Sequence, residues 1–425
     1  MSSRHVLPPS LLDTDLYKQA VLRHFRDVQA TYRFTHRDKD VPFTRQCIDA
    51  FRDSVSKFGA LSLSDEEHAW LKATCPYFSD EYLHYLRQYH FKPEQVSIRF
   101  VPLAHDANLG HPEIEAVGPW LETILWEVPL MACLSELYFN VVDTDWNYAG
   151  QEEQSYAKAE DLIKAGCSFS EFGTRRRRSY HNQDIVVQGL VRATKDFSGP
   201  GKLTGTSNVH LARVHGLSPV GTIAHEWFMG IGASKGYEHA NGIALTLWEE
   251  VYPNALQLAL TDTFSTEVFY KVSHTVFQCP SADTYAQDFV EDPERARRWK
   301  GLRQDSGDPF IYAPRAREIY ESLGIDHREK IIIFSDALSV EKAKKLKAQC
   351  DEVGFTASFG IGTSFTNDFK KASSGGTEKS KALNMVIKLA AVDGKPCVKI
   401  SDELTKNTGD PDIVKLVKQI YHLPL

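Results

Sequence analysis

The sequence predicts an α/β protein, in which an irregular, incomplete seven-stranded β/α barrel is joined to an α+β N-terminal domain. Between Gly166 and Thr363, seven short apolar runs each end in small, polar or charged residues. Helix-like stretches separate most of these runs, as crossover helices separate the buried strands of a parallel sheet. This alternation is absent before about residue 145 and after about residue 375. We therefore expect a barrel over 146–374 and an α/β domain over 1–145 that is completed by 375–425.

The helices of the predicted barrel have recognisable boundaries. The stretch 151–165 is a predicted helix that ends at Gly166, because glycine readily adopts the left-handed conformation after a helix. The stretch 176–195 carries apolar residues at helical spacing. Two further predicted helices, 313–323 and 340–353, are each followed by a glycine.

The flanking segments have a different pattern. Ser64 followed by three acidic residues predicts a helix start, and 96–101 alternates like a half-buried strand. Near the C-terminus, the apolar runs 385–392 and 397–400 flank Asp393-Gly394, which is a strong hairpin signal. We expect this hairpin to return to the N-terminal domain.

Composition excludes several classes of protein. A net charge of −7, with 42% hydrophobic residues, is typical of a soluble globular protein and gives no general attraction to nucleic acid or acidic membranes. The seven cysteines have no C-x-x-C spacing, so a zinc site or disulfide framework is not expected and a reducing compartment fits. The richest apolar stretch, 124–142, is interrupted by acidic and polar residues. We expect a cytoplasmic protein, with a nuclear location as the alternative, that binds neither nucleic acid nor membranes.

The polar clusters that follow the seven runs are predicted to form one site. In a β/α barrel, the loops after the strands line one face, and the chemistry takes place there. The clusters are Glu171–Arg175, Gly205–Asn208, Gly221–Glu226, Leu260–Phe264, Arg303–Asp308, Phe334–Asp336 and Phe359–Thr363.

The first cluster continues into four consecutive arginines, Arg175 to Arg178. Such a run is usually a solvated surface feature, and it could also be a nuclear-import patch. At the start of a helix, however, basic residues oppose the helix dipole, which suggests that an anionic ligand offsets the cost. The preceding Phe172 could present its ring to a flat ligand.

His225 lies where a strand is predicted to end. A lone histidine is more often structural than catalytic, but its position beside six other polar strand ends favours chemistry. A neutral imidazole is a good nucleophile toward phosphorus, and a carboxylate on its other ring nitrogen would fix the tautomer. By strand order Asp262 is the nearest candidate for that carboxylate, although it could equally cap the next helix.

Two later clusters suit a phosphorylated sugar. Ser306-Gly-Asp-Pro309 has turn chemistry, yet Asp305 could stabilise a developing sugar cation and Arg303 could hold an anion in a bidentate fork. Phe359-Gly-Ile-Gly-Thr363 is weak evidence alone, but the final loops of β/α barrels often bind phosphate. Together the clusters favour attack by a flat aromatic base on a phosphorylated sugar with an anionic leaving group.

With these motifs the sequence resembles the nicotinate phosphoribosyltransferase family, and its fungal members most closely. The resemblance implies a type II phosphoribosyltransferase-like fold and a homodimer with shared sites. It also implies conversion of nicotinate and phosphoribosyl pyrophosphate to nicotinate mononucleotide and pyrophosphate in NAD salvage, coupled to ATP hydrolysis. The resemblance covers nearly the whole chain and is carried by Asp13–Lys18, Trp120–Glu127, Glu171–Ser179, Gly221–Trp227, Arg303–Pro309 and Phe359–Asp368.

The resemblance also implies roles for individual residues. His225 is the implied site of phosphorylation by ATP, oriented by Asp262, and Asp305 faces the ribose. Mg²⁺ is expected with the pyrophosphate, and no dedicated ligand cage is visible in the sequence. The implied nicotinate contacts are Tyr17 of the partner subunit, Phe172, Arg175, Ser207, Thr222 and Arg303, and the implied phosphate and ribose contacts are Arg175, Asp336, Gly360, Gly362 and Thr363.

Three alternatives are open at this point. Nicotinamide is the alternative substrate; relatives that use it carry an acidic residue where this chain has Ser207, whose hydroxyl can donate to an acid. A barrel glycosidase could use two carboxylates such as Asp262 and Asp305, but it would leave His225 without a role. An RNA-binding protein could use Arg175 to Arg178, although the acidic charge balance argues against it.

Overall fold

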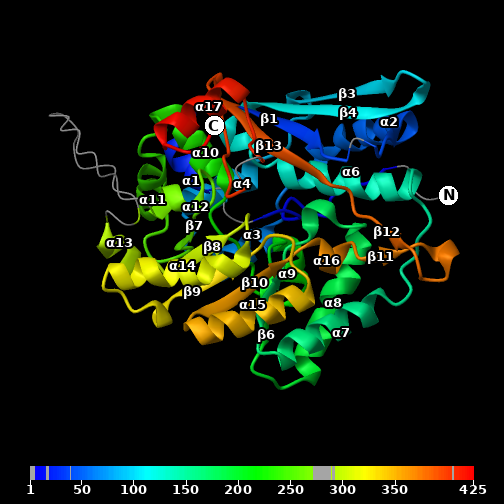
Figure 1. The fold of residues 1–425 in the computed structure, drawn as a ribbon. Helices are drawn as coiled ribbons and strands as arrows, with labels where there is room; N and C mark the ends of the chain where they lie inside the picture. Colours follow the sequence, from blue (N-terminus) through cyan, green and yellow to red (C-terminus); the bar gives the residue numbers. More distant parts are fainter. Residues whose placement is uncertain (1–4, 16–18, 39, 271–288, 290–291, 404–405) are drawn as a thin grey trace.

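The computed structural model describes residues 5–15, 19–38, 40–270, 289, 292–403 and 406–425. Two six-stranded sheets dominate this part of the chain, one antiparallel and one parallel. In Figure 1 the antiparallel sheet lies above the parallel one, and the longer barrel helices line the lower side. A mixed α/β fold was predicted, and this architecture confirms it.

The antiparallel sheet combines both ends of the chain. Strand β13 pairs with β1 from Ala30↔Val392 to His36↔Met385, so the C-terminal hairpin returns to the N-terminal sheet as expected. Asp393 and Gly394 have φ of 47° and 74°, the left-handed pair that a type I′ turn requires. The second strand of the hairpin is shorter than the predicted run 397–400 and precedes it in the chain. The domain boundaries remain a prediction. The order is β14 (Lys395–Pro396), β13 (Met385–Val392), β1 (Gln29–His36), β4 (Asp106–Pro119) and β2 (Phe43–Thr44), with β3 (Val96–Leu103) also on β4.

The parallel sheet has six strands among the described residues, whereas seven were predicted. The strand expected before Gly221 is reduced to a single parallel bridge between Thr206 and Pro219. Proline has no N–H, so it cannot extend a ladder of hydrogen bonds. The order is β6 (Lys202–Thr206), β5 (Ser168–Glu171), β10 (Thr356–Ile361), β9 (Ile331–Phe334), β8 (Gly301–Gln304) and β7 (Leu258–Leu260).

Two of the four helices predicted for the barrel follow the predicted boundaries. Helices α7 (Gln151–Lys164) and α15 (Val340–Val353) agree closely, and α14 (Pro309–Ser322) begins earlier because Asp308 caps its first turn. Helix α8 (Tyr180–Asp196) begins four residues later than predicted, since Ser179 is the N-cap and accepts from the Asn182 N–H. The arginine run therefore precedes the helix. The other barrel helices are α9 (Val209–His215), α10 (His225–Lys235), α11 (Ala240–Val251), α12 (Thr266–Tyr270), α13 (Pro293–Arg298) and α16 (Thr363–Thr366).

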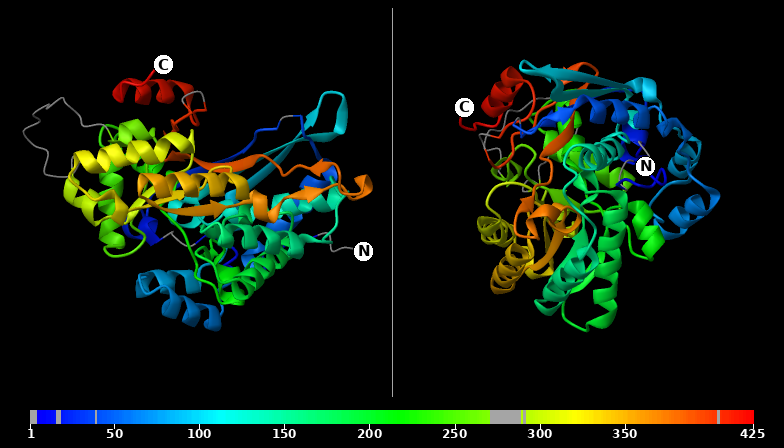
Figure 2. Two further views of the ribbon diagram at one scale, coloured as in Figure 1. Left: turned by 60° about the horizontal axis from the view of Figure 1, so that its bottom comes forward. Right: turned by 90° about the vertical axis from the view of Figure 1, so that its right-hand side faces the viewer.

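The remaining helices belong to the segments that flank the barrel, and several of them pack against the antiparallel sheet. Helix α3 begins after Ser64 with a complete capping box, as the sequence predicted. Figure 2 shows α17 beside this sheet in both views. The stretch Trp120–Val141 is long and apolar enough to cross a membrane, but it is 78% buried inside the molecule, as expected for a core helix. The set comprises α1 (Gln19–His24), α2 (Arg45–Val55), α3 (Asp65–Thr74), α4 (Asp80–Gln88), α5 (Trp120–Thr123), α6 (Glu127–Val141) and α17 (Pro411–Ile420).

An aromatic cluster fixes the helix that carries His225. The Trp120 ring lies 5.1 Å from Phe25 and 6.4 Å from Trp227, measured between ring centroids. A Cβ at Gly230, in the middle of α10, would lie 2.2 Å from the Trp120 ring. Helix α10 can therefore approach this closely only with glycine at that position, and the contact sets the position of its first residue, His225.

Candidate active site

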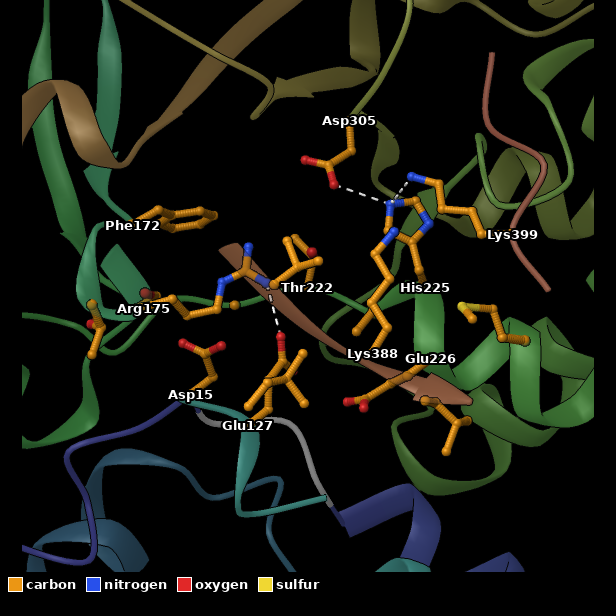
Figure 3. A pocket seen from close by; sticks show the side chains of 18 of the residues that line it. Asp15, Glu127, Phe172, Arg175, Thr222, His225, Glu226, Asp305, Lys388 and Lys399 are labelled. Atoms are coloured by element: carbon orange, nitrogen blue, oxygen red, sulfur yellow. Dashed lines mark hydrogen bonds and ion pairs between the residues drawn. The ribbon is translucent and has the colours of Figure 1, made fainter. Parts of the chain in front are cut away.

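One pocket lies between the strand ends of the barrel and strand β13 of the antiparallel sheet (Figure 3). Its lining brings together residues from four of the seven predicted clusters. It also contains residues from the N-terminal segment and from the C-terminal hairpin, such as Asp15 and Lys388. The predicted site residues in this lining are Phe172, Arg175, Ser207, Thr222, His225, Arg303 and Asp305.

The other predicted site residues lie outside the lining or outside the described residues. Gly360 supports the Phe172 ring from behind, because a Cβ there would lie 2.6 Å from it. Gly362 lies against the Phe172 carbonyl, and Thr363 begins the short helix α16. Asp336 follows β9, and burial and the nearby Asp305 raise its pKa. Tyr17 lies outside the described residues.

Arg303 is held rigidly at the end of β8. Its guanidinium donates to Thr222 Oγ1 at 2.6 Å, to Ser335 Oγ at 2.9 Å and to Asp305 Oδ1 at 3.0 Å. A guanidinium group that is held by three hydrogen bonds loses little conformational entropy when it binds a planar anion. The arrangement can therefore position a carboxylate beside Thr222.

Asp305 lies between two cationic groups and the imidazole. Burial alone would raise its pKa, but Arg303, His225 and Lys399 hold the pKa well below the ordinary value. The carboxylate is therefore charged throughout the physiological range, which suits a group that faces developing positive charge.

Both ring nitrogens of His225 have partners. Nδ1 lies 2.9 Å from Thr263 Oγ1, while Nε2 lies 3.0 Å from Asp305 Oδ2 and 2.9 Å from Lys399 Nζ. Burial and Lys399 lower the pKa of His225 to about 4, so the ring is neutral at pH 7. When Nδ1–H donates to Thr263, the Nε2 lone pair accepts from Lys399 and is available as a nucleophile.

Asp262 does not bind His225 directly, contrary to the prediction. Its Oδ2 lies 4.0 Å from His225 Nε2, beyond hydrogen-bond distance. Ser306 Oγ donates to this oxygen at 2.5 Å and Lys399 Nζ donates at 3.4 Å. The contacting carboxylate is Asp305, because Asp262 is fully buried behind the lysine.

The sequence analysis missed Lys388 and Lys399. Lys388 is half-buried and lies in the pocket on β13, and Lys399 follows the hairpin and is largely buried. Burial and the neighbouring Lys399 lower the pKa of Lys388 to about 7. Both lysines could have been found from the sequence, because each is the single cation within an apolar run of the predicted hairpin. Lysine is rarely placed inside a buried strand without a function.

Comparison with known proteins identifies the family. The sequence profile of the nicotinate phosphoribosyltransferase family matches residues 167–425, and that of its N-terminal domain matches 12–135. The chain belongs to the nicotinate phosphoribosyltransferase family. It is 42% identical to nicotinate phosphoribosyltransferase of Saccharomyces cerevisiae over 96% of this chain and 94% of the relative. It is 40% identical to that of Methanosarcina mazei over 97% of both chains.

Solved structures agree with this family assignment. The crystal structure of a Saccharomyces cerevisiae protein assigned to the same activity covers 98% of both chains with a TM-score of 0.90 and 40% identity. Nicotinate phosphoribosyltransferase of Porphyromonas gingivalis covers 97% of this chain with a TM-score of 0.85 and 34% identity. The fold implied by the resemblance is therefore the fold of this family.

Within this member of the nicotinate phosphoribosyltransferase family, only part of the arginine run reaches the pocket. Arg175 lines it and donates to Glu127 at 2.9 Å. Arg177 is buried and pairs with Asp13, and Arg178 is buried with its guanidinium 3.6 Å from the centre of the Phe139 ring. The solvated basic patch and the basic first helical turn considered for this run are both wrong, and so is an RNA-binding surface built from all four arginines.

Three acidic residues of the pocket, Asp15, Glu127 and Glu226, lie across it from Asp305. Glu226 accepts from Tyr32 Oη at 2.7 Å, and Tyr32 accepts in turn from Trp120 Nε1 at 2.9 Å. Glu127 and Asp15 lie on the same side, beside Arg175 (Figure 3).

Proposed function

We propose that this protein transfers a phosphoribosyl group from phosphoribosyl pyrophosphate to nicotinate, forming nicotinate mononucleotide and pyrophosphate for NAD salvage. The observation that carries the proposal is the pairing of a flat aromatic surface with a fixed guanidinium in one pocket. Phe172 can stack on the pyridine ring, and the Arg303 fork beside Thr222 can bind the carboxylate. Family membership supports the same reaction.

The transfer step needs little covalent chemistry from the protein. The lone pair of the pyridine nitrogen attacks C1 of the ribose, and the bond from C1 to the pyrophosphate oxygen breaks with its electrons on that oxygen. Positive charge develops on the ribose, and the charged Asp305 carboxylate stabilises it. Lys388 lines the pocket, where it can neutralise the leaving pyrophosphate.

We also propose that ATP phosphorylates His225. The Nε2 lone pair attacks the γ-phosphorus, the bond to the β,γ-bridging oxygen breaks, and ADP leaves. The Nδ1 proton stays on the ring and donates a hydrogen bond to Thr263 Oγ1 throughout, and Lys399 moves from Nε2 onto the phosphoryl oxygens. Hydrolysis of the phosphohistidine then returns the ring to its resting state and releases phosphate.

Magnesium is assigned to the substrate rather than to a protein cage. The described residues contain no group of three histidine, cysteine or acidic side chains that could hold a metal ion. The pocket carboxylate nearest the proposed reaction, Asp305, already accepts from Arg303 and from Ser335 Oγ. These residues do not fit a dedicated Mg²⁺ site, so we expect the ion to bind through the oxygens of the pyrophosphate.

Substrate choice is proposed to depend on Ser207. Nicotinate and nicotinamide have nearly the same shape, so charge and hydrogen bonding must separate them. Ser207 lines the pocket, and a hydroxyl there can donate to a carboxylate. Arg303 adds a positive charge that favours the acid. Nicotinamide is therefore the alternative substrate and the weaker one.

The assembly and location are proposed from weaker support. We propose a homodimer in which Tyr17 of the partner subunit completes the nicotinate site. We also propose a cytoplasmic enzyme, with a nuclear pool as the alternative. The support for a reducing compartment is that the described cysteines, six in number, are all buried free thiols. Microscopy of a fluorescent fusion tests the location.

A product assay tests the function. The purified protein is incubated with phosphoribosyl pyrophosphate, Mg²⁺ and either nicotinate, nicotinamide or quinolinate, with and without ATP. We expect nicotinate mononucleotide as the main product, with a higher yield in the presence of ATP. Formation of only the nicotinamide nucleotide would overturn the substrate assignment, and absence of every nucleotide would overturn the reaction.

A further inference from the structure

The segment Cys397–Asp402, called the strap below, connects the hairpin of the antiparallel sheet to the loops of the barrel. It leaves the hairpin at Cys397, whose N–H donates to Ala390 O at 2.8 Å. It then reaches the loop after β7, where the Ile400 N–H donates to Thr263 O at 2.9 Å. The strap therefore carries Lys399 from one sheet into the active site of the other.

The strap supports both nitrogens of the proposed nucleophile. Lys399 Nζ reaches His225 Nε2 directly at 2.9 Å. On the other side of the ring, Nδ1 contacts the side chain of Thr263, whose backbone oxygen accepts from the strap. A displacement of the strap would therefore disturb both contacts of the imidazole.

Asp402 attaches the end of the strap to the barrel. Its carboxylate accepts from the Thr266 N–H at 2.5 Å and from Thr266 Oγ1 at 2.7 Å, at the start of helix α12. Its own N–H donates to Ser306 Oγ at 3.2 Å, and Ser306 donates in turn to Asp262. Asp402 lies outside the pocket lining, so it does not touch the proposed substrates.

The backbone around Asp402 is adapted to this contact. A Cβ at Gly307 would lie 2.8 Å from Asp402 Cβ, and Gly307 has φ of 77°, so a side chain there is excluded twice. The preceding Ser401 is buried and has φ of 55°, a conformation that a non-glycine residue adopts only when its surroundings impose it. This unfavourable backbone conformation indicates that the surrounding structure holds the end of the strap in one defined position.

We propose that Asp402 is a positioning residue for the phosphorylation of His225. By fixing the strap on Thr266 and Ser306, it holds Lys399 at Nε2 and the Thr263 loop at Nδ1. This inference rests on the proposed ATP coupling of the enzyme. A residue of general structural importance would affect both activities equally. The positioning role instead predicts loss of phosphoryl transfer to His225 without equal loss of nucleotide formation.

The test compares Asp402→Asn with Glu403→Gln in the full-length protein. Asparagine keeps the shape, but its amide cannot accept from both donors of Thr266. Glu403 is the next residue, and its carboxylate pairs with Lys406 instead, so it is a matched control. Labelled phosphate on His225 is followed with γ-labelled ATP, and nucleotide formation without ATP is followed in parallel.

We expect Asp402→Asn to slow phosphohistidine formation at least tenfold, while ATP-independent nucleotide formation falls less than about threefold and Glu403→Gln has no effect. In a Lys399→Ala background, Asp402→Asn should cost less than it does in the wild type, since the two changes share the contact at Nε2 and only the contact at Nδ1 remains to be disturbed. Equal losses of both activities, or full additivity with Lys399→Ala, would overturn the proposal. If Asp402→Asn fails to fold, Thr266→Val removes one of the two donors and should give a smaller loss of the same kind.

A spectroscopic measurement separates this inference from the function on which it rests. If the wild-type protein forms no phosphohistidine, the proposed ATP coupling is wrong. The positioning role is then decided by the ¹⁵N NMR shifts of the His225 ring, which report its tautomer. Shifts that change in Asp402→Asn and not in Glu403→Gln support the role, and unchanged shifts overturn it.

Discussion

Arg177 donates two parallel hydrogen bonds to Asp13, one to each carboxylate oxygen at 2.7 Å, although the residues are 164 positions apart in the chain. Both side chains are buried, with exposed fractions of 2% and 0%. Burial alone would raise the pKa of Asp13, but Arg177 and Asn208 lower it below the ordinary value. This pair fixes the N-terminal segment that leads into Asp15 of the pocket.

We expect Arg177→Met to lower the free energy of unfolding by about 3–5 kcal/mol, because it leaves the Asp13 carboxylate buried without its counter-charge. Urea denaturation measures the change. The control is Arg192→Met, which breaks the more exposed pair with Glu152 and should cost less than about 1 kcal/mol. Similar losses for the two variants would mean that the buried pair is not a special contributor to stability.

We expect His225→Ala to abolish ATP stimulation and nicotinate-linked ATP hydrolysis, while slow ATP-independent nucleotide formation survives. Among the pocket side chains, this imidazole is the group best suited to accept a phosphoryl group. Its pKa of about 4 also predicts that the ATP-dependent rate is not lost through protonation of His225 until the pH falls toward 4. Coupled assays of ATP hydrolysis and nucleotide yield check both points, and full coupling in the variant would contradict them.

Binding of pyrophosphate should weaken as the pH rises through about 7. Burial and the cations Lys399, Arg37 and Arg175 lower the pKa of Lys388, so the free enzyme loses the Lys388 charge near pH 7. The charged form predominates below that pH and attracts the anion. We expect the dissociation constant of inorganic pyrophosphate, measured by calorimetry, to rise about fivefold or more between pH 6 and 8.5.

Lys388→Met is the variant that assigns this pH dependence. It should bind pyrophosphate weakly at every pH and lose the inflection near 7, whereas Lys395→Met, on the exposed turn side of the same hairpin, should behave like the wild type. An inflection that persists in Lys388→Met would belong to the ligand or to another group.

Ser207→Asp should shift substrate preference from nicotinate toward nicotinamide, mainly through loss of activity with nicotinate. The new carboxylate would face the carboxylate of the acid and lose the serine donor, yet it could accept from the amide. Arg303 remains, so the shift should be partial. Values of kcat/KM for both substrates check it, and an unchanged ratio in a folded variant would mean that Ser207 does not contact the carboxylate.

Mixed dimers test whether Tyr17 completes the neighbouring site. Tyr17→Ala and Arg303→Ala should each be inactive alone. If the sites are shared, one site of each mixed dimer contains both defects and the other contains neither. After complete exchange of equal amounts, half of the dimers are mixed, so activity should recover to about a quarter of that of the wild type. No recovery after confirmed exchange would place Tyr17 in its own subunit's site or outside it.

The sequence predicted the barrel well because its signals are local. Apolar runs, glycine stops and the Asp393-Gly394 turn depend on a few neighbouring residues, and the structure confirms them. The prediction of a seventh strand was wrong, because an apolar run alone does not show that Pro219 limits the pairing to one bridge. The predicted start of α8 was wrong because the serine that caps the helix follows the arginines. The predicted exposure of the arginine run was wrong because Arg177 and Arg178 are buried, although charged runs usually lie in solvent.

The site was predicted in outline and not in its contacts. Phe172, Thr222 and Arg303 meet in the pocket because the ends of parallel strands meet at one edge. Strand order could not show that Asp305 rather than Asp262 contacts His225, since that depends on side-chain directions and on the intervening lysine. Lys399 comes from a different sheet, and no rule based on barrel strands can find it.

The return of the C-terminal hairpin to β1 has a consequence for how the enzyme is made. Residues Ala30 and Val392 are paired neighbours, so the antiparallel sheet cannot close until a ribosome has released more than 390 residues. The barrel strands and His225 emerge earlier, without Lys388 and Lys399. The site should therefore gain its phosphate-handling cations only after translation has passed the strap.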